Sequence, residues 1–139
     1  MTINEIQDEL IEDFSFYQDW MEKYEYIIQL GKEVPLIKEE YKKEDYIIKG
    51  CQSKVWLYPE LRDGKVYFTA DSDAIITKGL VSLMVKVLSG HTPQEIAQAD
   101  LYFIDEIGLK EHLSPTRANG LLSMVKQMKL YAVALQMKA

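Results

Sequence analysis

The sequence is poor in the side chains that bind metals through sulfur or nitrogen. It has one cysteine, Cys51, and two histidines in 139 residues. A single cysteine excludes a disulfide within the chain, and an iron–sulfur cluster commonly takes about four thiolate ligands. We therefore expect no bound metal. Because no second cysteine can resolve a bond to Cys51, any sulfur chemistry at this residue has to involve another molecule.

Long apolar runs and an excess of basic charge are also missing. No apolar stretch approaches the ~20 residues that cross a bilayer, and the N-terminus lacks the basic and apolar segments of a secretory leader. The formal net charge is −6, so the surface is repelled by nucleic-acid phosphates and by acidic membranes. We expect a cytoplasmic protein that binds neither nucleic acid nor membrane. The acidic surface leaves a protein partner with a basic patch possible.

The remaining composition is that of an ordinary folded domain. Hydrophobic residues make up 47% and charged residues 27% of the chain, which is enough apolar material for a core. A domain of this size buries roughly two-thirds of its unfolded surface. Since no repeat or linker divides the chain, we expect residues 1–139 to form a single domain.

Helices are predicted at both ends of the sequence. Thr2 and Glu5 have the spacing of a capping box, and apolar residues then recur at helical intervals up to Gly31, either in one bent helix or in two joined near Ser15. The later helical patterns include a long terminal helix with Leu121 and Leu122 among its inward residues. Their predicted starts lie at Ile75, after Thr92 and after Ser114.

The middle of the chain has the pattern of strands. Asp63-Gly64 is a typical hairpin turn between two runs rich in branched and aromatic residues, 54–58 and 65–69. Residues 46–48 could add a third short strand. Gly50 and Cys51 would then lie in the tight link between this strand and the next.

The surroundings of Cys51 suggest a reactive thiol. Glycine at position 50 permits a sharp turn and the close approach of another molecule. Lys49 and Lys54 flank the site and could favour a thiolate or a persulfide anion. The alternative interpretation is that Cys51 is a small buried hydrophobic residue.

Four sequence blocks resemble one known family. Gly-Cys-Gln-Ser-x-Val-Trp stands at 50–56, and Asp-Ser-Asp-Ala-x-Ile-x-Lys-Gly-Leu stands at 71–80. His-Leu-Ser-Pro-Thr-Arg at 112–117 is followed by Gly-Leu, and the pattern from Trp20 to Gly31 also matches. These blocks, in this order, resemble the SufE/CsdE family of sulfur acceptors. Residues 92–110 match the family only loosely.

The resemblance implies both a fold and a function. The fold would be α+β, with a small antiparallel sheet of about three strands packed against helices, related to scaffolds of the IscU kind. Cys51 would accept persulfide sulfur from a pyridoxal-phosphate-dependent cysteine desulfurase, of the SufS or the CsdA kind, and so stimulate it. The sulfur would pass to an iron–sulfur cluster scaffold complex. The chain would hold no cofactor and would act as an accessory protein rather than as a stand-alone enzyme.

The same blocks single out residues that would support Cys51. Gly50, Gln52 and Ser53 belong to the cysteine motif. Arg117 lies in the first turn of a helix, where the dipole does not favour a cation. It would either contact the desulfurase or an anionic sulfur, or pair with a nearby carboxylate. Asp73, with Asp71, is expected to end a strand and cap a helix, or to contact the cysteine loop.

Two other functions stay open at this stage. An iron–sulfur scaffold has a related fold, but such scaffolds offer several thiolates and this chain offers one. A thiol-dependent hydrolase would need a histidine beside Cys51. We expect His91 to be solvated in a loop, and His112 to make local hydrogen bonds before the last helix.

Overall fold

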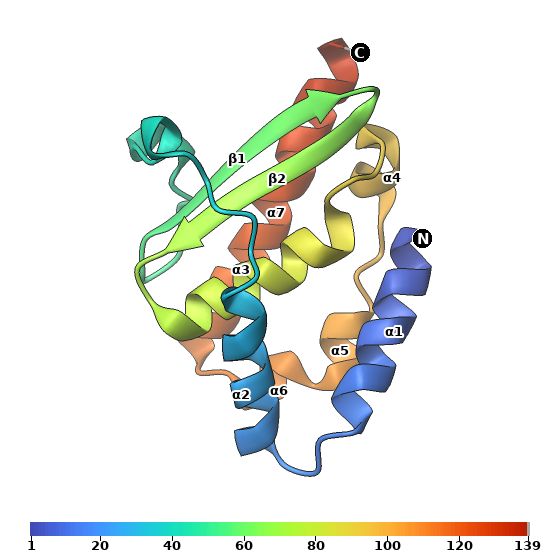
Figure 1. Ribbon diagram of the computed structural model, residues 1–139, viewed down its shortest axis with the longest axis vertical. Helices are drawn as coiled ribbons and strands as arrows, with labels where there is room; N and C mark the ends of the chain where they lie inside the picture. Colours follow the sequence, from blue (N-terminus) through green and yellow to red (C-terminus); the bar gives the residue numbers. More distant parts are fainter. Residues whose placement is uncertain (139) are drawn as a thin grey trace.

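The computed structural model describes residues 1–138 and has an α+β architecture, as the resemblance implied. Figure 1 shows a β-hairpin lying across α3 and α7, with α1 and α2 on either side of the opposite end of the molecule. The helices are α1 (Ile3–Ser15), α2 (Trp20–Gly31), α3 (Ile75–Leu88), α4 (Pro93–Gln98), α5 (Phe103–Ile107), α6 (Leu109–His112) and α7 (Pro115–Lys138). The hairpin strands are β1 (Val55–Arg62) and β2 (Lys65–Ser72), preceded by the 3-10 turns η1 (Glu39–Tyr41) and η2 (Glu44–Tyr46).

The N-terminal segment forms two helices rather than one bent helix. The predicted capping box is confirmed, because the Glu5 N–H donates to Thr2 Oγ1 at 3.0 Å and the Thr2 N–H donates to the Glu5 carboxylate at 2.9 Å. After α1 ends, Asp19 caps α2 by accepting the Glu22 N–H at 2.9 Å. This second cap, which starts a new helix direction, separates the two elements.

The sheet has two strands within residues 1–138, so the third strand expected at 46–48 is not formed. Both turn residues, Asp63 and Gly64, have positive φ, which suits the twist of a two-residue hairpin. Residues 46–48 contribute only a single bridge between Ile47 and Trp56 and a hydrogen bond from the Ile48 N–H to Val55 O at 2.8 Å. The chain turns away directly afterwards at Gly50, so pairing does not extend.

Helix α3 occupies the centre of the core, where Leu80, Leu83 and Met84 are almost fully buried. Gly79 lies where α3 crosses α2: a Cβ at this position would be 2.3 Å from Ile27 O. This glycine therefore serves the close approach of α2 rather than packing under the cysteine loop. No helix within residues 1–138 has both the length and the apolarity to cross a membrane.

Candidate functional site

The loop that carries Cys51 rests against the start of α7. Gly50 has φ 94°, a left-handed conformation that favours glycine. A Cβ at Gly50 would lie 2.5 Å from Ser123 Oγ on α7, so the close approach also requires glycine. The corner turns the next residue inward, and Cys51 Sγ lies 3.6 Å from Gly120 O. The local sequence thus holds the only thiol against a helix.

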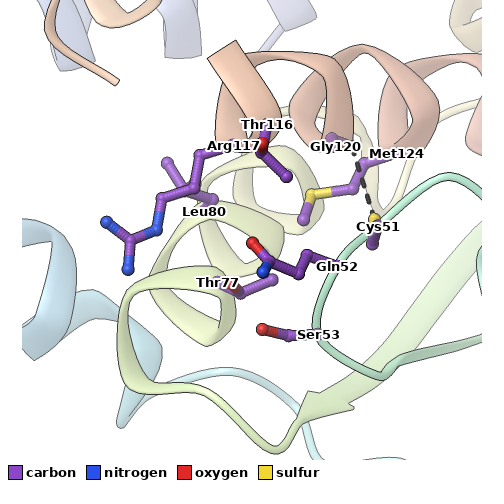
Figure 2. Close-up of a pocket in the computed structure, with 9 residues that line it drawn as sticks. All are labelled: Cys51, Gln52, Ser53, Thr77, Leu80, Thr116, Arg117, Gly120 and Met124. Atoms are coloured by element: carbon purple, nitrogen blue, oxygen red, sulfur yellow. Dashed lines mark hydrogen bonds between the residues drawn. The ribbon is translucent and has the colours of Figure 1, made fainter. Parts of the chain in front are cut away.

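A cavity of about 60 Å³ adjoins the sulfur atom. Figure 2 shows that its walls come from the cysteine loop, from α3 and from α7. The lining residues are Cys51, Gln52, Ser53, Thr77, Leu80, Thr116, Arg117, Gly120 and Met124. The structure therefore brings four of the predicted site residues together, namely Cys51, Gln52, Ser53 and Arg117. Gly50 instead faces Ser123, and Asp73 lies outside this lining.

The electrostatic surroundings of Cys51 differ from those predicted. Burial raises the pKa of the Cys51 thiol, because a thiolate is poorly solvated there. The Lys49 side chain is 82% exposed, and its ammonium lies 3.5 Å from the Glu44 carboxylate instead. The prediction that flanking lysines favour a thiolate is thus wrong for this conformation. The resting sulfur is a half-buried thiol that donates a weak hydrogen bond to the Gly120 carbonyl.

Arg117 stands at the rim of the cavity with an exposed side chain. Within residues 1–138, its guanidinium has no carboxylate within 4.0 Å, so the predicted alternative of a local ion pair is not realised. Its backbone N–H donates to Ser114 Oγ at 3.2 Å, which fixes the first turn of α7. Figure 2 shows the guanidinium extending away from Cys51, past Leu80.

Asp73, directly after β2, and Ser72, the last residue of β2, brace the far end of the cysteine loop. Asp73 Oδ1 accepts the Lys54 N–H at 3.1 Å, and Ser72 Oγ donates to Lys54 O at 2.8 Å. The predicted contact with the cysteine loop is therefore confirmed. The predicted strand end is confirmed, since β2 ends at Ser72. The predicted capping of α3 is wrong, because its N-cap residue is Ala74, whose side chain cannot cap, and Ser72 Oγ accepts only the Ala74 N–H, at 3.3 Å, ahead of the helix.

Asp71 has a separate, electrostatic role. Its carboxylate lies 2.9 Å from Lys42 Nζ and 3.3 Å from Lys78 Nζ. Burial alone would raise the pKa of Asp71, but hydrogen bonds from Lys42, the Ser72 N–H and Lys78 outweigh it and lower the pKa. This carboxylate ties the η1 region to the hairpin and to α3.

Neither histidine lines the cavity. His91 is buried, and its ring nitrogens lie 3.3 Å from Leu88 O and 2.9 Å from Met1 O. The prediction that it is solvated is wrong. His112 stacks on Trp20 with ring centroids 4.1 Å apart and has Nδ1 at 2.9 Å from Gly108 O, which confirms its local bonding.

Cys51 therefore has no adjacent histidine that could act as the base of a thiol hydrolase. Across residues 1–138, no three His, Cys, Asp or Glu side chains gather in a way that could hold a metal ion.

Several cavity residues were not singled out from the sequence. Thr116, Gly120 and Met124 are spaced by four residues on α7, so they share one helix face with a regular spacing that could have indicated a common site. A Cβ at Gly120 would lie 3.5 Å from Cys51 Sγ, so this glycine leaves open space beside the sulfur. Thr77 and Leu80 have the same kind of spacing on α3, but nothing local indicates that they face Cys51.

Comparisons with known proteins agree with the resemblance found in the sequence. The family model described as the SufE Fe-S metabolism associated domain matches residues 8–132. An uncharacterized SufE-like protein of Rhizobium meliloti (strain 1021) is 39% identical over 127 residues, which cover 88% of this chain and 91% of that protein. A SufE-like protein of Synechocystis sp., also uncharacterized, is 38% identical over 128 residues, covering 92% and 80%.

A solved structure has the same fold. The solution structure of a hypothetical protein from Thermus thermophilus superposes with a TM-score of 0.79, covering 95% of this chain and 96% of that one. Its sequence is 18% identical to this chain. The likeness therefore concerns the fold alone.

Proposed function

This chain belongs to the SufE family of proteins associated with Fe–S metabolism, and we propose that Cys51 accepts sulfur from a cysteine desulfurase and passes it to iron–sulfur cluster assembly. The observation that carries the proposal is the position of the only cysteine. Cys51 follows a left-handed glycine, lies against α7 and borders a small cavity. The working compartment of such a carrier is the reducing cytoplasm, where a lone thiol persists.

Sulfur transfer to Cys51 is a thiol–persulfide exchange. The Cys51 thiolate attacks the terminal sulfur of a persulfide on the desulfurase. A new S–S bond forms as the old one breaks, and the desulfurase sulfur leaves as a thiolate with the electron pair of the broken bond. In the second step an acceptor thiolate attacks the terminal sulfur on Cys51 in the same way, which regenerates the Cys51 thiolate. No net oxidant or reductant is needed.

The cavity suits a residue that alternates between a thiol and a persulfide. Its volume of about 60 Å³ is about twice the share of one water molecule in the liquid, roughly 30 Å³. The cavity therefore has room for one additional sulfur atom beside Gly120. The raised pKa of the resting thiol also slows its oxidation by small molecules, because the thiolate is the reactive form.

The surrounding residues take supporting roles in this proposal. Gly50 sets the corner, Gln52 and Ser53 present the loop to a partner, and Asp73 braces its far end through Lys54. Arg117 contacts the desulfurase or the anionic sulfur. The support for that role is an exposed guanidinium at the rim of the cavity, to which residues 1–138 offer no ion pair.

Replacing Cys51 with serine tests the proposal. The hydroxyl is nearly the same size, and a stable interface buries about 800 Å² per partner, so Cys51→Ser should still bind the desulfurase. It should gain no sulfur adduct in mass spectrometry and should not stimulate multiple-turnover alanine production. Ser123→Ala is the matched control, since it changes a hydroxyl that touches the loop but leaves the sulfur. If Cys51→Ser stimulates the desulfurase as well as the parent protein does, Cys51 is not a sulfur carrier.

A further inference from the structure

Helix α7 is apolar on two sides, although only one side faces the core. Its inward residues, such as Leu121, Met124 and Met128, are almost fully buried. On the other side Leu122, Leu130, Val133 and Met137 are 46%, 52%, 45% and 84% exposed. At about 100° per residue these four and Lys126 fall within an arc of about 80°. We call these five residues the outer stripe; Leu122 belongs to it and not, as predicted, to the core.

A surface helix normally has one apolar face and one polar face. The outer stripe departs from this pattern, because four large apolar side chains along one face of α7 are exposed and have no partner in residues 1–138. Scattered exposed apolar residues are common on any protein. A continuous stripe along one helix is instead typical of an interaction surface.

The charge on α7 is opposite to that of the whole chain. The helix contains four cations, Arg117, Lys126, Lys129 and Lys138, and no Asp or Glu, whereas the chain as a whole has a net charge of −6. The Lys129 ammonium donates to Ala99 O and so points towards α4. Lys126 is the cation within the outer stripe. Whereas the acidic chain as a whole leaves room for a partner with a basic patch, this face suits an acidic partner.

The outer stripe continues into a groove beside the cysteine loop. Lys49, Ser123, Lys126, Gln127 and Leu130 line this groove, which has a volume of about 250 Å³. Gly50 packs on Ser123 at its edge. The groove shares no lining residue with the Cys51 cavity. A molecule bound there would contact Lys49, two residues before Cys51, and leave Arg117 free.

We propose that the outer stripe and this groove bind a helix of the protein that takes sulfur from Cys51, and that this helix has an apolar stripe bordered by Asp and Glu. The proposal rests on the carrier function proposed above. A carrier has to meet two proteins, and the Arg117 side of the loop is assigned to the desulfurase. The groove offers the acceptor an approach to Cys51 from a separate set of residues.

Two other occupants fit the surface less well. In a pair of α7 helices from two copies of the chain, cations would meet with no carboxylate from either helix between them. An anionic membrane would meet one lysine within the stripe on a chain that is acidic overall, whereas membrane-surface helices are rich in basic residues. An acidic helix of a protein matches both the apolar residues and Lys126.

The test compares loading and unloading of Cys51 in matched variants. Leu130→Glu and Lys126→Glu place a carboxylate in the outer stripe, and Met21→Glu places one at an apolar residue of α2 that is 68% exposed. Each protein is loaded by the desulfurase and then mixed with the purified iron–sulfur scaffold complex. Mass spectrometry follows the sulfur on Cys51, and calorimetry measures binding of the unloaded protein to the same scaffold complex. Circular dichroism verifies that each variant is folded.

We expect both α7 variants to load with sulfur normally. Their affinity for the scaffold and their rate of unloading should each fall at least about ten-fold, because like charges then meet at the interface. Met21→Glu should behave as the parent protein does. Unchanged scaffold binding and unloading in the α7 variants would overturn the proposal. So would a defect in loading alone, which would assign the stripe to the desulfurase.

Two further results would overturn it as well: dimerisation of the parent chain that Leu130→Glu abolishes, or co-sedimentation with phosphatidylglycerol vesicles that Leu130→Glu abolishes. If the parent chain takes up no sulfur, the carrier function fails by itself. The calorimetric comparison still decides whether the stripe binds the scaffold complex, since it uses the unloaded protein.

Discussion

Replacing Arg117 with alanine should leave the fold intact and slow sulfur loading. The side chain is exposed and, within residues 1–138, has no ion pair. A cation in the first turn of a helix is disfavoured by roughly 0.3–1 kcal/mol, so its removal is neutral or slightly stabilising. We expect the free energy of unfolding to change by less than about 0.5 kcal/mol, which corresponds to about 1–4 °C in melting temperature.

The effect on transfer should be larger than the effect on stability. A hydrogen bond to a charged group contributes about 1.5–3 kcal/mol when its partner would otherwise be unsatisfied. If the guanidinium contacts a carboxylate of the desulfurase or the anionic sulfur, its loss therefore slows loading roughly ten- to hundred-fold. The loading rate of Arg117→Lys should lie between those of the parent and Arg117→Ala, because lysine keeps the charge but not the planar fork of donors.

The assay is single-turnover loading of Cys51 by a persulfurated desulfurase held below saturation, followed by mass spectrometry. Arg62→Ala is the matched control, since Arg62 is the only other arginine and pairs with Glu60 on β1, with Nε 3.2 Å from the carboxylate. It should load at the parent rate. Loading of Arg117→Ala at the parent rate would refute the reasoning about the rim of the cavity. A fall in its melting temperature of about ten degrees or more would refute the reasoning about stability.

Three further predictions follow from the packing and the pKa shifts. Gly79→Ala should lower the urea midpoint, at a cost of at least about 1–3 kcal/mol, because the added methyl group would lie 2.3 Å from Ile27 O; an unchanged midpoint would contradict the close helix crossing. Because burial raises the pKa of Cys51, its alkylation by iodoacetamide should reach half the maximal rate at a higher pH in the folded chain than in urea. Coinciding pH profiles of the two states would count against a buried thiol. The pKa of Asp71 is lowered in the fold, so the stabilisation by its carboxylate is present near neutral pH and is lost as the pH falls through the lowered pKa. Asp71→Asn should therefore lose on the order of 1 kcal/mol of unfolding free energy at neutral pH. Equal urea midpoints of variant and parent at that pH would show that the bonds to Lys42 are not stabilising.

The features that sequence predicted correctly are those determined by neighbouring residues. The capping boxes at Thr2 and Thr92 and the turn at Asp63-Gly64 each depend on side chains within three positions of one another. Local chemistry therefore suffices to predict them. The cysteine motif was instead identified through its resemblance to a known family, which a contiguous run such as Cys51, Gln52 and Ser53 makes readable.

The features that sequence missed depend on contacts between distant segments. His91 is buried because its ring reaches the backbone of Met1, 90 positions away. Gly79 is needed because α2 crosses α3 there, which no pattern within α3 indicates. Lys49 is next but one to Cys51 in sequence, yet its ammonium pairs with Glu44. Proximity in sequence thus predicted a charge effect on the thiol that the folded loop does not provide.

The proposed function places two opposing requirements on the cysteine loop. A thiol whose pKa is raised by burial is a poor nucleophile, whereas accepting sulfur requires a thiolate that meets another protein. The sulfur itself is held by one bond to the Gly120 carbonyl, with Sγ at 3.6 Å, and an S–H group is a weak donor. The stronger restraints, from Ile48 to Val55 and from Lys54 to Asp73, lie at the two ends of the loop. The bond that holds the sulfur is thus the weakest restraint in the loop, and in the proposed function a docking partner would have to break it to expose the thiol as a nucleophile.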